Sequence, residues 1–201
     1  STIDIKESIG ATASLASIVI TDNLGVIFDK DISATTLTAT GTAIVAGNVI
    51  ANIGLGDDIF SHLVATSNKT ITGTVSETSA VSGSDMLFHN VADGAVIKST
   101  ITGTVAIDGA DVGTTAKAGS LVLNSNATIT DLDIIGGNVT AEASQVEIKG
   151  NLISSTGVVF DKNTGGAKLL ASGTTAQTVT GTLAGIGAAE GTLQVTNTHA
   201  S

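Results

Sequence analysis

The segment Gly56–His62 reads GDDIFSH, and it returns further along the chain as GSDMLFH at Gly83–His89. The two copies align without gaps, so that glycine, aspartate, two apolar residues and histidine recur at matching positions. The Gly-x-Asp/Asn element occurs four times at nearly even spacing, at Gly56-Asp58, Gly83-Asp85, Gly109-Asp111 and Gly136-Asn138. A fixed period of this size is typical of stacked supersecondary units rather than of one irregular globule.

Two further families of short repeats run along the chain. Ile-Thr-Gly-Thr-Val occurs at Ile71–Val75 and Ile101–Val105, with looser copies at Ala39–Ala43 and Val179–Leu183. Gly-Asn followed by Val or Leu begins at Gly47, Gly137 and Gly150. Because turn residues recur between similar apolar runs, these repeats also indicate a chain that returns to the same local structure many times.

The longest match joins the two halves of the chain. GVIFDK at Gly25–Lys30 recurs as GVVFDK at Gly157–Lys162. At the same offset, four residues are matched by identical ones: Leu37, Ala39, Gly41 and Thr42 by Leu169, Ala171, Gly173 and Thr174. This offset is close to five times the step between the Gly-x-Asp elements, in agreement with the shorter repeats.

The amino-acid composition favours strands. The 201 residues are 42% hydrophobic with a mean hydropathy of +0.42, yet they include no Pro, Cys, Trp, Tyr or Arg. The apolar residues are chiefly Val, Ile, Leu and Ala among abundant Thr, Ser and Gly. β-Branched side chains suit pleated strands, and small ones suit a narrow core. An ordinary β-sandwich usually contains a large core aromatic and loop prolines.

Short alternating runs bounded by Asn, Asp or Gly predict the strands themselves, for example at Ser17–Ile20, Ser120–Leu123 and Val146–Lys149. Together with the period, they predict an all-β fold: a parallel β-helix (β-solenoid) with coils of about 26–27 residues, each rising about 4.8 Å. Residues 1–201 are predicted to form one domain, alone or as one unit of a longer tandem or stacked array. The alternative is an irregular β-sandwich with coincidental repeats.

Charge and residue usage exclude several classes of partner. A net charge of −10 and a pI near 4.4 disfavour nucleic acid and anionic membranes, and the absence of Arg removes the usual phosphate ligand. No apolar run is long enough to cross a bilayer. The absence of Cys excludes disulfides and thiolate chemistry, and it fits an extracellular or cell-surface location. A start at Ser1 rather than Met is expected of a processed or excised segment.

Aspartates in the Gly-x-Asp repeats are the candidate metal ligands. Gly54–Phe60 fits the GxGxDxU core of calcium-binding nonapeptide β-rolls, in which glycines permit the tight turn and carboxylates supply hard oxygen ligands. A calcium roll needs adjacent turns of this motif, whereas only Gly-x-Asp persists here. The aspartates are therefore expected to cap turns, with calcium as the alternative at Asp57, Asp58, Asp85 and Asp111.

Histidines and threonines provide two other candidates. His62 and His89 occupy matched repeat positions, so stacked coils would make them neighbours, as a solvated stack or as a zinc or pH-sensing pair. The Thr-x-Thr pairs Thr40/Thr42, Thr72/Thr74, Thr102/Thr104 and Thr180/Thr182 place two hydroxyls on one face of a strand. Repeated on successive coils, they would form a flat threonine array similar to those of ice-binding β-helices.

The chain resembles large bacterial surface antigens in GTLQVTNT at Gly191–Thr198, SLASIVITDN at Ser14–Asn23 and the Gly-Asn-Val repeats. It is most similar to autotransporter passenger regions of the rickettsial outer-membrane type, and more loosely to repetitive surface-layer proteins. The resemblance implies a β-helical stalk at the cell surface, with roles in adhesion or in a protective coat. It supplies no catalytic residue, and the chain contains no G-x-S-x-G, H-E-x-x-H or P-loop motif.

A non-enzymatic extracellular structural protein is therefore the first functional prediction. Solenoid ends expose unpaired strand edges, and neither end of this sequence carries a charged or proline-bearing cap. Subunits are predicted to self-associate, end to end or side to side, into a filament or surface layer, with no cofactor. The alternative is an adhesin or ligand-binding β-helix with calcium, a glycan or a surface receptor as partner, and an ice-binding protein is less favoured.

Overall fold

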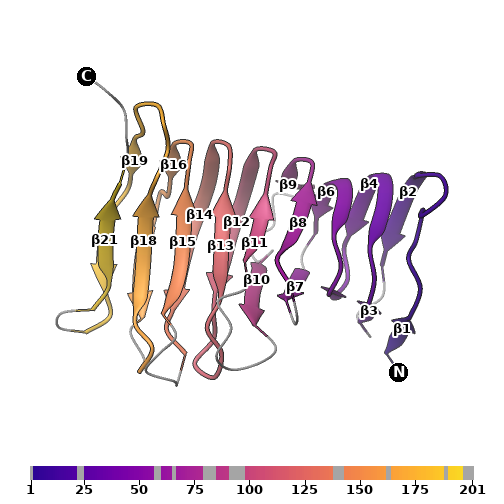
Figure 1. Cartoon of the computed structure of the whole chain (residues 1–201), viewed down its shortest axis with the longest axis horizontal. Coiled ribbons are helices and arrows are strands. Elements are labelled where there is room, and N and C mark those ends of the chain that lie inside the picture. The colour runs from indigo at the N-terminus through magenta and orange to yellow at the C-terminus, as the bar shows by residue number, and fades with distance from the viewer. Residues whose placement is uncertain are drawn as a thin grey trace.

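The chain forms a parallel β-solenoid. The computed structural model describes residues 2–21, 25–56, 60–64, 67–78, 85–90, 98–137, 143–161, 164–187 and 190–196. These residues contain 21 strands and no helix, and parallel pairing joins all the strands into one sheet that coils about a long axis (Figure 1). The predicted all-β solenoid is thus confirmed. The alternative sandwich is wrong, because a sandwich is built from antiparallel strands.

Each coil contributes a strand to three columns, which we name A, B and C in the order in which the chain visits them. Column A contains β1 (Ile3–Ile5), β3 (Val26–Phe28), β5 (Ala43–Val45), β7 (Phe60–Val64), β10 (Asp85–Asn90), the second halves of β12 (Val105–Val112) and β14 (Ala127–Ile135), β17 (Gly157–Asp161) and β20 (Leu183–Gly185).

Column B begins with the bridge between Ile9 and Ile32. It continues through the first halves of β4 (Ile32–Ala39) and β6 (Val49–Leu55), β8 (Lys69–Thr72), β11 (Ser99–Ile101), β13 (Ser120–Leu123), β15 (Ser144–Ile148), β18 (Ala167–Ala171) and β21 (Thr192–Val195). Column C contains β2 (Leu15–Ile20), the second halves of β4 and β6, β9 (Val75–Glu77), the first halves of β12 and β14, β16 (Leu152–Ile153) and β19 (Val179–Thr180).

The core lies on the axis and is made of apolar side chains that alternate along each strand with outward residues. In β6, for example, Val49, Ala51, Ile53 and Leu55 are buried, whereas Ile50 and Asn52 are exposed. Most inward residues are register partners of inward residues in the coils on either side. The core is therefore a set of continuous apolar rows that run the length of the molecule, which explains the preference for Val, Ile, Leu and Ala.

The predicted constant step is wrong in detail, because coil lengths vary. The steps from Phe60 to Met86 and from Asp131 to Gly157 in column A match the predicted period. The steps from Val26 to Ala43 and from Ala43 to Phe60, in the first coils, are much shorter. Only the inward strand positions must superpose. Turn length is free to vary, since a few added loop residues cost little.

The Ile-Thr-Gly-Thr-Val repeats are confirmed as stacked turns. Ile71 pairs with Ile101 and Val75 with Val105, so the two copies lie directly over one another at the turn from column B to column C. A Cβ on Gly103 would lie 2.1 Å from the carbonyl oxygen of Gly73. Glycine is required here because the two turns are in backbone contact.

Gly-Asn marks a second kind of turn. A Cβ on Gly47 would lie 2.3 Å from the carbonyl carbon of Lys30, and one on Gly150 would lie 2.5 Å from that of Ser125. The following asparagine then joins its coil to the next: Asn48 Oδ1 accepts a hydrogen bond of 3.0 Å from the Thr70 amide, and Asn151 Oδ1 accepts one of 2.8 Å from the Thr178 amide. Glycine thus allows close stacking and asparagine ties successive coils together.

The long sequence match is only partly structural. Val26–Asp29 and Val158–Asp161 both follow a positive-φ glycine and both lie in or directly after a column A strand. Leu37 lies in column C, however, whereas Leu169 lies in column B. The match therefore relates equivalent positions over one strand and then fails, because the intervening turns differ in length.

Candidate functional site

The most distinctive surfaces of the molecule are its two ends, where the rows of apolar core residues stop. One row in each column can be followed through every coil. The column A row is Ile3, Val26, Ala43, Phe60, Met86, Ala110, Leu132, Val158 and Leu183. The column B row is Ile9, Ile32, Val49, Ile71, Ile101, Leu123, Ile148, Ala171 and Val195. The column C row is Ile18, Leu37, Ile53, Val75, Val105, Ala127, Leu152 and Val179.

Exposure rises at three of the six row ends, whereas the other three, Ile9, Ile18 and Val179, stay partly buried against the core. The interior members are at most 8% exposed, but Ile3 is 52%, Leu183 38% and Val195 66% exposed. Leu193, beside Val195 in β21, is 49% exposed, although its partner Leu169 is fully buried. Residues with the pattern of core positions thus lie in solvent at both ends. We call these two surfaces the N-end and the C-end; the chain enters at one and leaves at the other (Figure 1).

The N-end is hollow. A cavity of about 300 Å³ opens there, and its lining is almost wholly apolar: Ile3, Ile5, Ile9, Ile18, Val19, Ile20, Thr21, Val26 and Phe28. Large apolar hollows and patches of this kind are uncommon on soluble monomers and usually mark interaction sites. The C-end instead presents protruding aliphatic side chains, with Ile186 69% exposed beside Leu183.

Lys6, next to the N-end, forms ion pairs with one aspartate of its own coil and one of the next coil. Lys6 Nζ lies 2.5 Å from Asp4 Oδ2 and 2.8 Å from Asp29 Oδ2. Hydrogen bonds to the Asp29 and then the Asp4 carboxylate raise the pKa of Lys6 to about 12. This lysine therefore stays charged and is paired within its own molecule at neutral pH.

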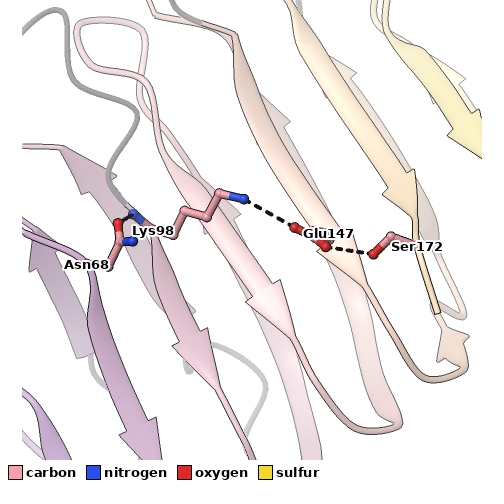
Figure 2. A network of polar contacts seen from close by, with 4 residues as sticks. All are labelled: Asn68, Lys98, Glu147 and Ser172. Carbon is pink, nitrogen blue, oxygen red and sulfur yellow. Dashed lines mark hydrogen bonds and ion pairs between the residues drawn. The ribbon is translucent and has the colours of Figure 1, made fainter. Parts of the chain in front are cut away.

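A polar network on the side of the solenoid crosses column B. Lys98 Nζ donates to Glu147 Oε2 at 3.3 Å, Ser172 Oγ donates to Glu147 Oε1 at 2.6 Å, and the Lys98 amide donates to Asn68 Oδ1 at 2.9 Å (Figure 2). Since β13 lies between β11 and β15, the Lys98 side chain spans a whole strand to reach its partner.

Burial alone would raise the pKa of Glu147, whose side chain is 14% exposed, but hydrogen bonds from Ser172 and Lys98 outweigh it. The pKa of Glu147 is therefore lowered, and its carboxylate is ionised and bonded on both oxygens at neutral pH. Sequence reasoning missed this network, because its two charged residues are 49 positions apart and belong to no repeat.

A second cavity of about 570 Å³ opens on the side of the first coils. It is lined by Ser8, Ile9, Gly10, Ala11, Asp31, Ile32, Ser33, Asn48, Ile50, Thr70 and Thr72. The lining thus combines residues that carry hydroxyl and amide groups with Ile50, which is 55% exposed. Asp31 Oδ1 accepts two hydrogen bonds from Asn48, one from the backbone N–H at 2.7 Å and one from Nδ2 at 3.2 Å.

Among the candidate calcium ligands in the described part of the chain, Asp85 and Asp111 are not register partners. Asp57 and Asp58 lie outside the described residues, as does the side chain of Asp85. Asp85 pairs in register with Gly109, and Asp111 pairs with Leu87 and Asp133, so the Gly-x-Asp elements of these coils do not superpose. Within the described part of the chain, no three His, Asp or Glu side chains are grouped as a metal site would require.

Two predicted arrangements are wrong: the direct stacking of the two histidines and the flat array of threonines. His62 pairs with Phe88, and His89 pairs with Leu63, because the step between these coils is one residue shorter than the sequence repeat. Of the Thr-x-Thr pairs, those at Thr72 and Thr102 lie at the turn from column B to column C. Those at Thr40 and Thr180 lie at the turn from column C to column A. The four pairs therefore form no single flat array.

Comparison of the chain with protein-family models, with curated proteins and with solved structures gave no match. The resemblance to surface antigens therefore stays a prediction. Among the described residues there is no helix of the length and apolarity that a membrane-spanning helix needs.

Proposed function

We propose that the protein is a non-enzymatic structural protein whose copies self-associate end to end into a filament. The observation that carries this proposal is the exposure of the core rows: Ile3 at the N-end, and Leu183 and Val195 at the C-end, are 38–66% exposed at positions whose interior equivalents are buried. Burying apolar surface stabilises by about 25 cal/mol per Å². A further parallel coil laid on either end would cover these residues.

The strand edges support the same proposal. A sheet edge that is long and uncovered is a template for pairing, and natural proteins usually blunt it with proline, charge or a covering element. This chain has no proline, and its edge strands β1, β2, β20 and β21 are largely exposed. The Lys6 charge beside β1 is paired with Asp4 and Asp29 within its own molecule.

We further propose an extracellular or cell-surface location for this assembly. The absence of cysteine, the acidic composition and the resemblance to bacterial surface antigens support it. Antibody labelling of intact cells of the source organism tests the location. Signal that appears only after the cells are made permeable contradicts it.

Sedimentation velocity across a hundredfold range of concentration, with electron microscopy of the same samples, tests self-association. Species that grow with concentration, and particles elongated along the solenoid axis, are expected. Lysine at an exposed end position, Val195→Lys, should abolish growth. Lysine at an exposed lateral position, Ile153→Lys, is the matched control and should not, because Ile153 lies in the interior strand β16 on the side of the solenoid. A wild-type chain that stays monomeric throughout contradicts the proposal.

Ligand binding on the side of the solenoid is the second candidate function, in keeping with an adhesin. The cavity of about 570 Å³ favours it, since Ser8, Ser33, Thr70 and Thr72 line it together with the apolar Ile50. Alternating hydroxyl and apolar groups match the faces of a sugar ring. Screening against glycans, with Thr72→Arg to fill the cavity, tests this. Binding that Thr72→Arg leaves unchanged contradicts a site in this cavity.

A further inference from the structure

We infer that the copies stack head to tail, with the C-end of one copy on the N-end of the next and all strands parallel across the junction. This inference deepens the proposed self-association and depends on it. It specifies the polarity of the interface, the strands that pair and their register. It follows from three features of the ends: the direction of their free backbone groups, the register of their apolar residues and the lengths of their strands.

The free backbone groups of β1 and β20 are complementary. In a parallel pair, successive residues direct their N–H and C=O groups alternately to one neighbouring strand and then to the other. Ile3 N donates to Gly25 O, and Ile5 O accepts from Asp29 N, so the intervening Asp4 directs its N–H and C=O to the free edge. At the other end, Thr182 O accepts from Val158 N and Ile186 N donates to Phe160 O. By the same alternation, Leu183 and Gly185 face the free edge.

These groups fit one another in one register. With Ile3 of the next copy opposite Leu183, the Asp4 N–H reaches the Leu183 C=O, and the Gly185 N–H reaches the Asp4 C=O. This is the pattern already present between β17 and β20, where Val158 pairs with Leu183. β1 and β20 are also equally long, at three residues each.

The same register continues the core. Ile3 of the next copy extends the column A row that ends at Leu183, and Ile9 extends the column B row that ends at Val195. Gly185 lies opposite Ile5, in a row where the preceding member is Phe160. The apolar hollow of about 300 Å³ at the N-end, which includes Ile3, Ile5 and Ile9, is thereby closed by the protruding Leu183, Leu193 and Val195.

The reverse arrangement, with two N-ends facing each other, fits poorly. When one copy is turned over with column A kept against column A, the order of its columns is reversed, so that column B of one copy meets column C of the other. The six-residue strand β2 would then face the segment around Ile9, which forms an isolated bridge rather than a strand. Two C-ends would place the four-residue β21 against the two-residue β19.

A head-to-tail contact joins two different surfaces and leaves one of each free. Such heterologous contacts generate open polymers unless the rotation closes a ring, whereas an N-end to N-end contact stops at a dimer. With each copy continuing the coils of the one before, the assembly grows along the solenoid axis. The polarity therefore decides between a filament and a dimer.

Two blocked variants test the polarity. The first is Leu193→Lys/Val195→Lys, which places charge on the C-end at residues that are 49% and 66% exposed. The second is Ile3→Lys/Asp4→Pro, which places charge on the N-end and removes an N–H that faces the free edge. Both change residues that are at least about two-fifths exposed, and circular dichroism with thermal melting confirms that each variant folds. Ile50→Lys and Ile153→Lys, on the sides of the solenoid, are the controls.

Each blocked variant alone is expected to remain monomeric in sedimentation velocity, and an equimolar mixture is expected to form one-to-one dimers and nothing larger. The C-end blocked variant retains its N-end, and the N-end blocked variant retains its C-end, so the two complement each other. Dimers of the C-end blocked variant alone would show N-end pairing and overturn the polarity while leaving self-association intact. A mixture that stays monomeric while the wild type assembles also overturns the polarity. A monomeric wild type overturns the proposed function itself.

Discussion

At the scale of single residues, stacked turns permit almost no side chain at certain positions. Gly103 is expected to be intolerant of substitution, because a Cβ there would lie 2.1 Å from the carbonyl oxygen of Gly73 and 2.5 Å from its carbonyl carbon. Gly103→Ala should lower the free energy of unfolding by more than about 2 kcal/mol, as overpacking against a rigid backbone does. Urea denaturation measures the loss.

The matched control is Thr104→Ala, which changes an exposed residue of the same turn. It should alter the stability by no more than about 0.5 kcal/mol, as surface substitutions usually do. Equal stability of Gly103→Ala and the wild type would contradict the close contact between the two turns.

Removal of one buried hydroxyl is expected to stabilise the protein rather than destabilise it. Ser120, at the start of β13, is 3% exposed, and its Oγ has no hydrogen-bond partner among the described residues. Leaving a buried polar group unsatisfied costs about 1–3 kcal/mol. Ser120→Ala is therefore expected to raise the free energy of unfolding by about 1 kcal/mol.

Ser144, on the neighbouring strand β15, provides the comparison. It is fully buried as well, but its Oγ accepts from the Gly119 amide at 3.1 Å and donates to the Ile135 carbonyl. Ser144→Ala should therefore destabilise the protein, because it leaves both of these backbone groups without their side-chain partner. A loss of stability in Ser120→Ala as well would show that its hydroxyl is satisfied in solution.

At the scale of elements, the Lys98–Glu147 pair joins strands that are two coils apart. Glu147 has a pKa below its ordinary value of 4.5 in the folded protein, so the folded state favours its ionised form. A lowered folded-state pKa gives a stabilisation that is fully present above the unfolded-state pKa and is lost as the pH falls through the folded-state value. Wild-type stability should thus decline below pH 4.5 partly through this residue.

Glu147→Gln is expected to cost about 1 kcal/mol at neutral pH, because Lys98 is partly exposed and its pairing is weakened by solvent. The difference between wild type and variant should shrink as the pH falls below 4.5, the ordinary pKa of the carboxyl. Thermal melting at a series of pH values measures it. A difference that stays constant down to acid pH would contradict a role for the carboxylate charge.

Elements whose turns are fixed by close contact could be predicted from the sequence, and those with free turns could not. Ile71–Val75 and Ile101–Val105 stack as their repeat indicates, because Gly73 and Gly103 hold the two turns in backbone contact. The Gly-x-Asp period does not stack at the next coil, because Gly109 pairs with Asp85 rather than with the matched glycine of the repeat. A sequence period reports a register only where the whole turn between two strands is repeated.

The same limit explains why the exposed ends of the solenoid and the Lys98–Glu147 pair could not be predicted from the sequence. Apolar residues two positions apart, such as Leu193 and Val195, predict a strand with one inward face, but they do not show that this strand is the last one. Predicting the exposed ends from the sequence therefore requires a correct count of the coils. That count is wrong whenever the length of a turn is not recognised. Lys98 and Glu147 likewise become neighbours only through the register of β11, β13 and β15.

At the scale of the whole molecule, the solenoid is a one-dimensional stack in which each coil is stabilised by its neighbours. Interior coils have two neighbours, whereas the coils that contain Ile3 and Leu183 have one, and their apolar residues remain exposed. Unfolding should therefore begin at the ends. Any contact that covers an end adds the missing neighbour and protects the coil from fraying.

This dependence links thermal stability to self-association. Association of folded copies shifts the folding equilibrium by mass action, so the melting temperature of the wild type is expected to rise with protein concentration. Leu193→Lys/Val195→Lys, which blocks the C-end, should melt at one temperature at every concentration, whereas the lateral variant Ile153→Lys should keep the wild-type dependence. Circular dichroism melts over a hundredfold range of concentration measure this. A wild-type melting temperature that is constant over that range, or a blocked variant that still gains stability with concentration, would show that the exposed apolar rows are not where copies meet.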